Sequence, residues 1–350
     1  MQIENLTDIV SVPAAEASHE ATYQKIEAVT TQIAQSGFWL APLKQEMRKA
    51  IIGQDHLLER LLVCLLSGGH MLLEGVPGLA KTLAVKSLAR AINTDFNRIQ
   101  FTPDMLPADI LGTEIYNQRD TVFEVKRGPI FSSIILADEI NRAPAKVQSA
   151  LLEAMQEKQI TIGSQSYLLP ELFLVMATQN PIEQEGTYPL PEAQVDRFML
   201  KVVITYPSLE EERTLLELRD HADSRVDISP VAEPEHILAS RMVVDSIFID
   251  DKIKDYIVAL VCASRDPEHF GLDFAAHVET GASPRATLNL KTVSRCLAYL
   301  TGRGYVTPDD VKQAAFDVMR HRIRVSYEAE AESITSEDII RNMLDNLPVP

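Results

Sequence analysis

The stretch Gly75-Val76-Pro77-Gly78-Leu79-Ala80-Lys81-Thr82 decides how the rest of the chain is interpreted. It follows a short apolar run and precedes a helical pattern that begins near Lys81. A phosphate chain needs backbone N–H groups that converge on it at the positive end of a helix dipole, and glycines let the backbone wrap that closely. In such a loop the lysine supplies charge to the β- and γ-phosphates, and the Thr82 hydroxyl coordinates Mg²⁺.

One position departs from the usual pattern of such loops. Ala80 stands where a glycine usually precedes the lysine. Alanine fits at this position if residue 80 is already helical. The alternative interpretation is an accidental glycine-rich turn, and other parts of the chain have to decide between the two.

Five short apolar runs are predicted to be strands: His70–Glu74, Phe96–Gln100, Ser133–Ala137, Leu172–Thr178 and Phe198–Ile204. Helical patterns lie between several of them. The clearest helix places Val147, Ala150, Leu151, Ala154 and Met155 on one face. Strands that alternate with helices predict a parallel sheet covered on both faces. Ligands bind at the carboxyl ends of the strands in such sheets.

Two carboxylates stand where this rule places the chemistry. Asp138 and Glu139 directly follow the apolar run Ser133–Ala137. Asp138 can hold the metal, directly or through water, and Glu139 can polarise an attacking water. The alternative is a strand that ends in solvated acids. After the next run, Asn180 offers an amide that could orient the water and sense the γ-phosphate, although Asn-Pro is also an ordinary turn.

The composition predicts a globular protein of two domains. The chain has 350 residues, of which 46% are hydrophobic and 24% charged. Its net charge of -17 repels phosphate backbones and disfavours general nucleic-acid binding. The charge does not exclude a local basic groove. The three cysteines, Cys64, Cys262 and Cys296, are expected to be buried thiols in a reducing compartment.

The pattern changes near Tyr206. Ser208 and Glu211 form a predicted capping box, and Ser283-Pro284 and Thr307-Pro308 predict two further helix starts. We therefore expect three parts: residues 1–40 as a partly disordered tail and helix, 41–206 as an α/β nucleotide-binding domain, and 207–350 as a helical domain.

No targeting segment is visible in the sequence. Residues 1–35 lack the basic start and apolar run of a signal peptide, and no apolar run reaches the ~20 residues that span a bilayer. We expect a cytoplasmic protein without membrane insertion.

Four segments together resemble the MoxR ATPases of the AAA+ superfamily: Gly75–Thr82, Asp138–Pro144 (DEINRAP), Ala177–Pro181 and Gly186–Phe198 (GTYPLPEAQVDRF). The resemblance covers about Ile51 to Arg322. It implies a P-loop AAA+ parallel sheet core with a small all-helical lid, and ATP and Mg²⁺ as cofactors. It also implies a homo-oligomer in the form of a hexameric ring, and protein clients that include proteins with von Willebrand factor A domains.

The resemblance assigns roles to individual residues. Asn180 matches sensor 1, Arg197 the arginine finger offered to the neighbouring subunit, and Arg285 sensor 2. With Glu139 these are the expected catalytic residues. Arg197 could instead pair with Glu192 or Asp196, and Arg285 could be structural. The expected nucleotide-contacting residues are Ile52, Gly53, Gln54, Gly75, Val76, Pro77, Gly78, Leu79, Ala80, Lys81, Thr82, Leu83 and Asp138, with Thr82 and Asp138 on the metal.

Two segments are predicted to be β-hairpins, Glu114–Val125 and Ile160–Leu168. The resemblance implies that they are the helix-2 insert and the pre-sensor-1 hairpin of this family; the alternative is two ordinary surface hairpins. The eight histidines show no spacing typical of metal ligands. His321, between two arginines, is expected to be a solvated or phosphate-neutral helix end rather than a metal ligand.

The function that these residues favour is ATP hydrolysis at a subunit interface, which drives chaperone-like remodelling or maturation of partner proteins. Three alternatives stay open. They are a magnesium-chelatase-like motor subunit, a DNA-acting AAA+ ATPase and a nucleotide-binding scaffold that does not hydrolyse ATP. The net charge disfavours the second, and the presence of Lys81, Asp138, Glu139 and Arg197 disfavours the third.

Overall fold

A five-stranded parallel sheet lies at the centre of the nucleotide-binding part, with the strand order β2-β5-β8-β1-β9. The computed structural model describes residues 14–76, 78–180, 187–219 and 227–350. The strands of the sheet are β1 (Met71–Glu74), β2 (Phe96–Gln100), β5 (Ile134–Asp138), β8 (Leu174–Gln179) and β9 (Leu200–Val203). The five predicted runs and the parallel pairing are therefore confirmed, with shifts of one or two residues at some ends.

Helices cover both faces of this sheet. They are α3 (Asp55–Ser67), α4 (Lys81–Ala91), α5 (Pro107–Leu111) and α6 (Ala145–Glu157). Successive side chains of a strand point to opposite faces. Met71 and Leu73 accordingly pack with α3 and α4 in one hydrophobic cluster, whereas Leu72 packs with α5 and α6 in another. Near-continuous apolar strands are what a sheet buried on both sides requires.

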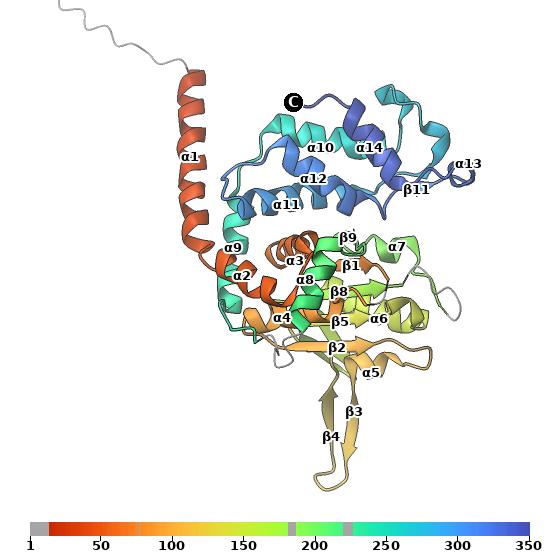
Figure 1. Ribbon diagram of the computed structural model, residues 1–350. Coiled ribbons are helices and arrows are strands. Elements are labelled where there is room, and N and C mark those ends of the chain that lie inside the picture. Colours follow the sequence, from red (N-terminus) through yellow and green to blue (C-terminus); the bar gives the residue numbers. More distant parts are fainter. Residues whose placement is uncertain (1–13, 77, 181–186, 220–226) are drawn as a thin grey trace, which may run out of the picture.

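Both predicted hairpins are present. The first consists of β3 (Gly112–Asn117) and β4 (Val122–Arg127), and it projects away from the sheet (Figure 1). The second consists of β6 (Gln159–Ile162) and β7 (Gln165–Leu168). Their roles in coupling to partners stay predictions.

The C-terminal part is mainly helical and lies beyond the β9 edge of the sheet (Figure 1). Its helices there are α10 (Asp251–Ala263), α11 (Pro284–Leu300), α12 (Pro308–Met319), α13 (Tyr327–Ala331) and α14 (Ser336–Asn346), whereas α9 (Pro234–Ser246) lies alongside the core and packs against α3. A short antiparallel pair, β10 (Val278–Thr280) and β11 (Arg324–Val325), lies among them. The predicted fold class is confirmed, and the structure adds this pair to the lid.

The predicted helix starts are also found. Glu211 accepts a hydrogen bond from the Ser208 backbone at 2.7 Å and opens α8 (Leu209–Arg219). Ser283 caps α11 by accepting from the Arg285 backbone N–H at 3.2 Å. Thr307 caps α12 in a capping box with Asp310. Local side-chain chemistry fixes these ends, which is why the sequence reveals them.

The N-terminal helices connect the two parts of the chain. They are α1 (Ala14–Ser36) and α2 (Leu40–Ala50). Between them, the fully buried Trp39 donates its indole N–H to Ser240 of α9 at 3.0 Å, and α9 also packs against α1 and α3. Because α9 contacts both parts, we keep the division at residue 206 as a proposal. The expected tail, residues 1–13, lies outside the described residues.

Two smaller expectations can be compared with the structure. Cys64 and Cys296 are buried, whereas Cys262 is half-exposed. No helix in the described ranges is long and apolar enough to cross a membrane.

Candidate functional site

The glycine-rich loop opens into a cavity of about 500 Å³ at the carboxyl edge of the sheet. The residues that line it are Gly75, Gly78, Leu79, Ala80, Lys81, Thr82, Leu83, Arg98, Asp138, Glu139, Thr178, Gln179 and Asn180. They come from the ends of β1, β5 and β8, from the start of α4 and from β2. The structure thus brings together most of the predicted phosphate-contacting, metal-binding and catalytic residues at one site.

Some predicted nucleotide contacts lie elsewhere. Ile52, Gly53 and Gln54 do not line this cavity. Gly53 has φ +70°, and a Cβ there would lie 2.4 Å from the Glu211 carboxyl carbon, so this segment packs against the start of α8. Val76 is not in the lining either, and Pro77 lies outside the described residues.

Lys81 is the first residue of α4, and its ammonium donates a hydrogen bond to the Gly75 carbonyl. Burial lowers the pKa of Lys81, and the nearby carboxylates Asp138, Glu139 and Glu74 oppose that shift. A half-buried cation at the N-terminus of a helix, bonded among the described residues only to a carbonyl of its own loop and close to several acids, is suited to a phosphate chain.

The condition under which alanine is expected to fit, that residue 80 is already helical, is not met. Ala80 is the N-cap of α4 and has φ +54° and ψ +20°, which is the left-handed region. An L-residue with a Cβ pays roughly 1–2 kcal/mol there, whereas glycine does not. The loop therefore keeps the backbone conformation that a glycine would favour, and alanine adopts it under strain.

Asp138 and Glu139 are held by hydrogen bonds from neighbouring strands. Asp138 accepts from the Thr178 hydroxyl at 2.6 Å and from Arg98 through Nε and Nη2 at 3.0 and 2.6 Å. Glu139 accepts from the Gln100 amide at 2.8 Å and is 3.1 Å from Arg142 Nε. Glu139 also has a positive φ of 59°. Strained backbone of this kind gathers at functional sites.

Sequence reasoning missed Arg98, Gln100 and Thr178. A signal was available for the first two, because Arg98 and Gln100 alternate at the end of a predicted strand and so share one face. In the sheet, Gln100 pairs in register with Asp138, which puts this face beside the two acids. The order of the strands, which the sequence did not provide, was needed to see it.

The donors in the cavity suit a magnesium ion. Thr82 supplies a hydroxyl and Asp138 a carboxylate, both hard oxygen ligands. The described residues contain no cluster of three or more His, Cys, Asp or Glu side chains that could enclose a metal. Mg²⁺ commonly uses one or two protein oxygens together with substrate phosphates and waters, so the site fits that ion.

Arg197 and Arg285 lie at the opposite edge of the sheet. They line a separate cavity of about 250 Å³ with Gly68, Gly69, His70, Met155, Gln156, Asp196, Met199 and Asn289. His70 precedes β1 and Arg197 precedes the parallel neighbour β9, whereas the glycine-rich loop follows β1. At ~3.3 Å per residue, β1 alone separates the two edges by roughly 13 Å.

Arg285 and Arg197 differ in whether their side chains have a described partner. Arg285 forms an ion pair with Asp196 at 3.4 Å. Within the described part of the chain, the exposed Arg197 side chain makes no hydrogen bond or ion pair. The alternative pairing of Arg197 with Glu192 or Asp196 is therefore not found; Glu192 pairs with Arg324.

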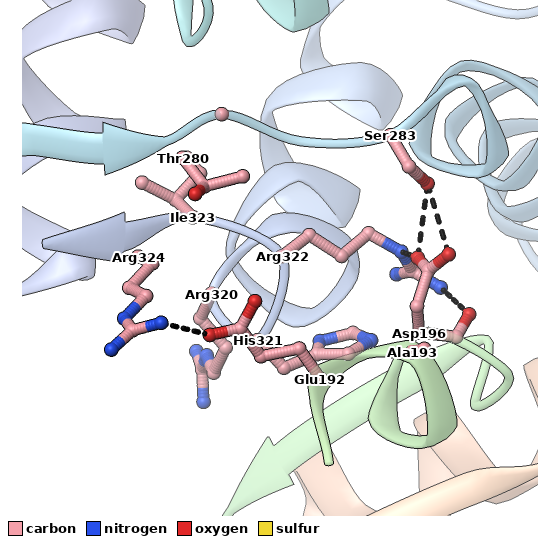
Figure 2. Close-up of a pocket in the computed structure, with 11 residues that line it drawn as sticks. Glu192, Ala193, Asp196, Thr280, Ser283, Arg320, His321, Arg322, Ile323 and Arg324 are labelled. Carbon is pink, nitrogen blue, oxygen red and sulfur yellow. Dashed lines mark hydrogen bonds and ion pairs between the residues drawn. The ribbon is translucent and has the colours of Figure 1, made fainter.

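A third cavity, of about 330 Å³, lies between α7 (Glu192–Val195) and the lid segment 320–324 (Figure 2). The buried guanidinium of Arg322 reaches Asp196 there, at 2.7 Å. His321 hydrogen-bonds the Phe198 carbonyl at 3.1 Å, and burial holds its pKa well below the usual value. The expectation of a solvated His321 is wrong, because the contact with Phe198 spans more than 120 residues of sequence and only folding creates it.

Two family models match parts of this chain. The family model described as "ATPase family associated with various cellular activities (AAA)" matches residues 70–200, and an AAA lid domain model matches residues 273–343. Chaperone MoxR1 of Mycobacterium tuberculosis is 48% identical over 311 residues, which are 87% of this chain and 81% of that protein.

Two further relatives cover similar lengths. An uncharacterized protein of Bacillus subtilis, YeaC, is 42% identical over 87% of this chain and 93% of its own. The crystal structure of a candidate ATPase from Cytophaga hutchinsonii is 46% identical, with a TM-score of 0.84 over 95% of this chain and 99% of that chain.

Proposed function

Because the chain belongs to the MoxR family of AAA+ ATPases, we propose that it hydrolyses ATP with Mg²⁺ in the cavity at the carboxyl edge of the sheet. The observation that carries this proposal is the meeting of Lys81, Thr82, Asp138 and Glu139 in that one cavity. We propose that the cycle drives chaperone-like remodelling or maturation of partner proteins in the cytoplasm, with von Willebrand factor A domain proteins as one class of client.

Different residues of the cavity bind the phosphates, activate the water and hold the metal. Backbone N–H groups of the loop at 78–80 hold the phosphates, and the Lys81 ammonium neutralises the β- and γ-phosphates. Glu139 polarises the attacking water, and Asn180 orients it. Mg²⁺, held by Thr82 and Asp138, would neutralise charge that develops on the phosphate oxygens.

The two arginines at the amino edge complete the site of a neighbour. Charge spreads over the oxygens of the γ-phosphoryl group as it leaves, and a guanidinium fork stabilises several oxygens at once. Arg197 and Arg285 lie across the sheet from their own loop, so we propose that both act on the nucleotide of the adjacent subunit in a homo-oligomeric, hexameric ring. Arg197 is exposed and unpaired among the described residues, as a group offered to another molecule should be.

Two substitutions separate binding from chemistry. Glu139→Gln keeps the shape of the side chain and removes the carboxylate, so ATP affinity should persist while turnover falls on the order of 10²–10⁴-fold. Lys81→Ala should lose ATP affinity with the fold intact. Calorimetry and phosphate release measure the two effects. Wild-type turnover in Glu139→Gln, or wild-type affinity in Lys81→Ala, would refute the assigned roles.

Mixing two inactive variants tests the subunit interface. Arg197→Ala subunits should bind ATP and hydrolyse it slowly, since arginine fingers contribute roughly 10³–10⁵-fold in rate. Lys81→Ala subunits keep an intact Arg197 and can donate it. The mixture should regain part of the activity, whereas mixtures that stay inactive although subunit exchange is confirmed would make Arg197 a cis or structural residue.

The Glu139→Gln variant can also be used to capture client proteins. Glu139→Gln in ATP should hold the client-engaged state, so proteins retained by it in ATP and released without nucleotide are the candidates. Retention of DNA in place of protein, lost as salt rises, would favour a DNA-acting ATPase instead.

A further inference from the structure

We propose that Arg322 of the lid positions Arg197 for the neighbouring subunit, through the hydrogen bonds that it makes to the segment Asp196–Met199. Arg322 is then a positioning residue for hydrolysis in the adjacent site, not in its own. The inference rests on the proposed trans role of Arg197.

A single buried side chain holds the backbone on both sides of Arg197. The Arg322 side chain is only 1% exposed. Its guanidinium donates to the Asp196 carbonyl at 3.0 Å, to the Phe198 carbonyl at 2.6 Å and to the Met199 carbonyl at 3.3 Å. A planar fork with five donors can make such a set, whereas lysine, a point charge, cannot.

Asp196 supplies the balancing charge and extends the contact to α11. Its carboxylate accepts from Arg322 Nε at 2.7 Å and from the Ser283 hydroxyl at 3.0 and 3.1 Å (Figure 2). Arg285, which follows this cap, pairs with the same carboxylate. Arg197 and Arg285, the two arginines proposed to reach the neighbour, therefore depend on the same group of contacts. That group joins Asp196 of the core to residues of the lid.

The hydrogen bonds fix the backbone around Arg197 and leave the Arg197 side chain without a partner among the described residues. The segment beneath Arg197 is bonded to a buried cation, while the Arg197 side chain itself is exposed and has no described partner. Preorganisation of this kind matters because a misplacement of ~1 Å at a reacting group can reduce the rate roughly 10²-fold. Because Arg322 belongs to the lid, the position of the lid also determines the position of the Arg197 that the subunit offers to its neighbour.

The test introduces Arg322→Lys either into the subunit that donates Arg197 or into the subunit that receives it. In the mixture of Arg197→Ala (acceptor) and Lys81→Ala (donor) subunits, only the donor's Arg197 acts. Arg322→Lys in the donor should reduce the rescued ATPase activity at least about tenfold. The same change in the acceptor should leave the rescue within about twofold. ATP affinity of Arg322→Lys in an otherwise wild-type chain should be unchanged.

Arg303→Lys in the donor is the matched control. Arg303 also makes a bidentate ion pair, to Asp310 at 2.9 and 2.6 Å, but within the lid and without contact to the segment that carries Arg197. It should leave the rescue unchanged. If Arg322→Lys subunits fail to fold or assemble, as judged by circular dichroism and sedimentation, Asp196→Asn takes their place in both positions.

The outcomes distinguish the two proposals. Equal losses in donor and acceptor would make Arg322 merely structural and overturn the inference, as would full rescue with the altered donor. Absence of rescue in the parent mixture would refute the trans role of Arg197, and the inference would fall with it.

Discussion

The guanidinium of Arg98 donates two hydrogen bonds to one carboxylate oxygen of Asp138, from Nε at 3.0 Å and from Nη2 at 2.6 Å. Asp138 is the carboxylate that we propose for Mg²⁺. If the metal binds this oxygen directly, a protein cation and the metal compete for the same ligand, and binding of the metal displaces Arg98 from it. An ion pair with a half-exposed arginine is weak enough to be exchanged in this way.

Arg98→Gln should make nucleotide binding more dependent on magnesium. With the competing cation removed, Asp138 is free for the metal, so the ratio of the Kd for ATP in EDTA to that in Mg²⁺ should rise severalfold. Calorimetry in the Glu139→Gln background measures both constants without turnover. Arg90→Gln, which breaks only an exposed pair with Asp227, is the control. A ratio that stays the same or falls would show that Arg98 does not compete with the metal.

Ala80→Gly should stabilise the protein. Glycine adopts the left-handed conformation of residue 80 without the ~1–2 kcal/mol that alanine pays, and its greater freedom in the unfolded chain offsets part of the gain. The free energy of unfolding from urea titration should rise by up to about 1 kcal/mol. Ala84→Gly, inside α4, should instead lower it by about 1 kcal/mol. Equal losses in the two variants would contradict the strain at Ala80.

Stability should fall in acid through His70. Burial lowers the pKa of His70 to about 4, and the hydrogen bond between Nε2 and the Met155 carbonyl opposes that shift. Nδ1 accepts a hydrogen bond from the Val175 N–H at 3.0 Å. The unfolded chain, with a histidine pKa near 6.5, binds the proton first, so stability is complete above pH 6.5 and is lost as pH falls toward 4. The loss between pH 7 and pH 5 should be roughly 2 kcal/mol.

Two variants show whether His70 is responsible for that acid loss. His70→Gln should make the free energy of unfolding less dependent on pH between 7 and 5. His269→Gln, at an exposed histidine, should leave the dependence unchanged. The same acid slope in wild type and His70→Gln would assign the effect to other groups, such as His321, whose pKa burial also lowers.

The β3–β4 hairpin should serve contact with partners and not hydrolysis. Tyr116 and Phe123 face each other across its strands, with ring centroids 5.2 Å apart, and are 47% and 69% exposed. Exposed apolar side chains gathered on a projecting element are typical of contact surfaces. The double variant Tyr116→Ser with Phe123→Ser should keep basal ATPase activity within about twofold and retain less client in the Glu139→Gln trap. Tyr327→Ser, on the lid and 80% exposed, should not alter retention.

Local chemistry is what the sequence by itself determined. The phosphate loop, the acids after β5 and the capped starts of α8, α11 and α12 each depend on a few neighbouring residues, so their spacing predicts them. The five strands followed from apolar runs between helices, and the parallel sheet from their alternation. The roles of Asn180, Arg197 and Arg285 came from family resemblance, and for these the spacing alone left other interpretations open.

Tertiary structure alone decided the contacts between distant segments. Arg98 reaches Asp138 because β2 and β5 are neighbours in the sheet, and Arg322 reaches Asp196 because the lid folds back over the start of β9. The left-handed Ala80 and the partly buried His321 likewise depend on tertiary structure, since the surrounding structure overrides the local preference of each residue. Such contacts join single polar residues far apart in sequence, and a pairing of this kind leaves no periodic signal along the chain, unlike the packing of a whole apolar face.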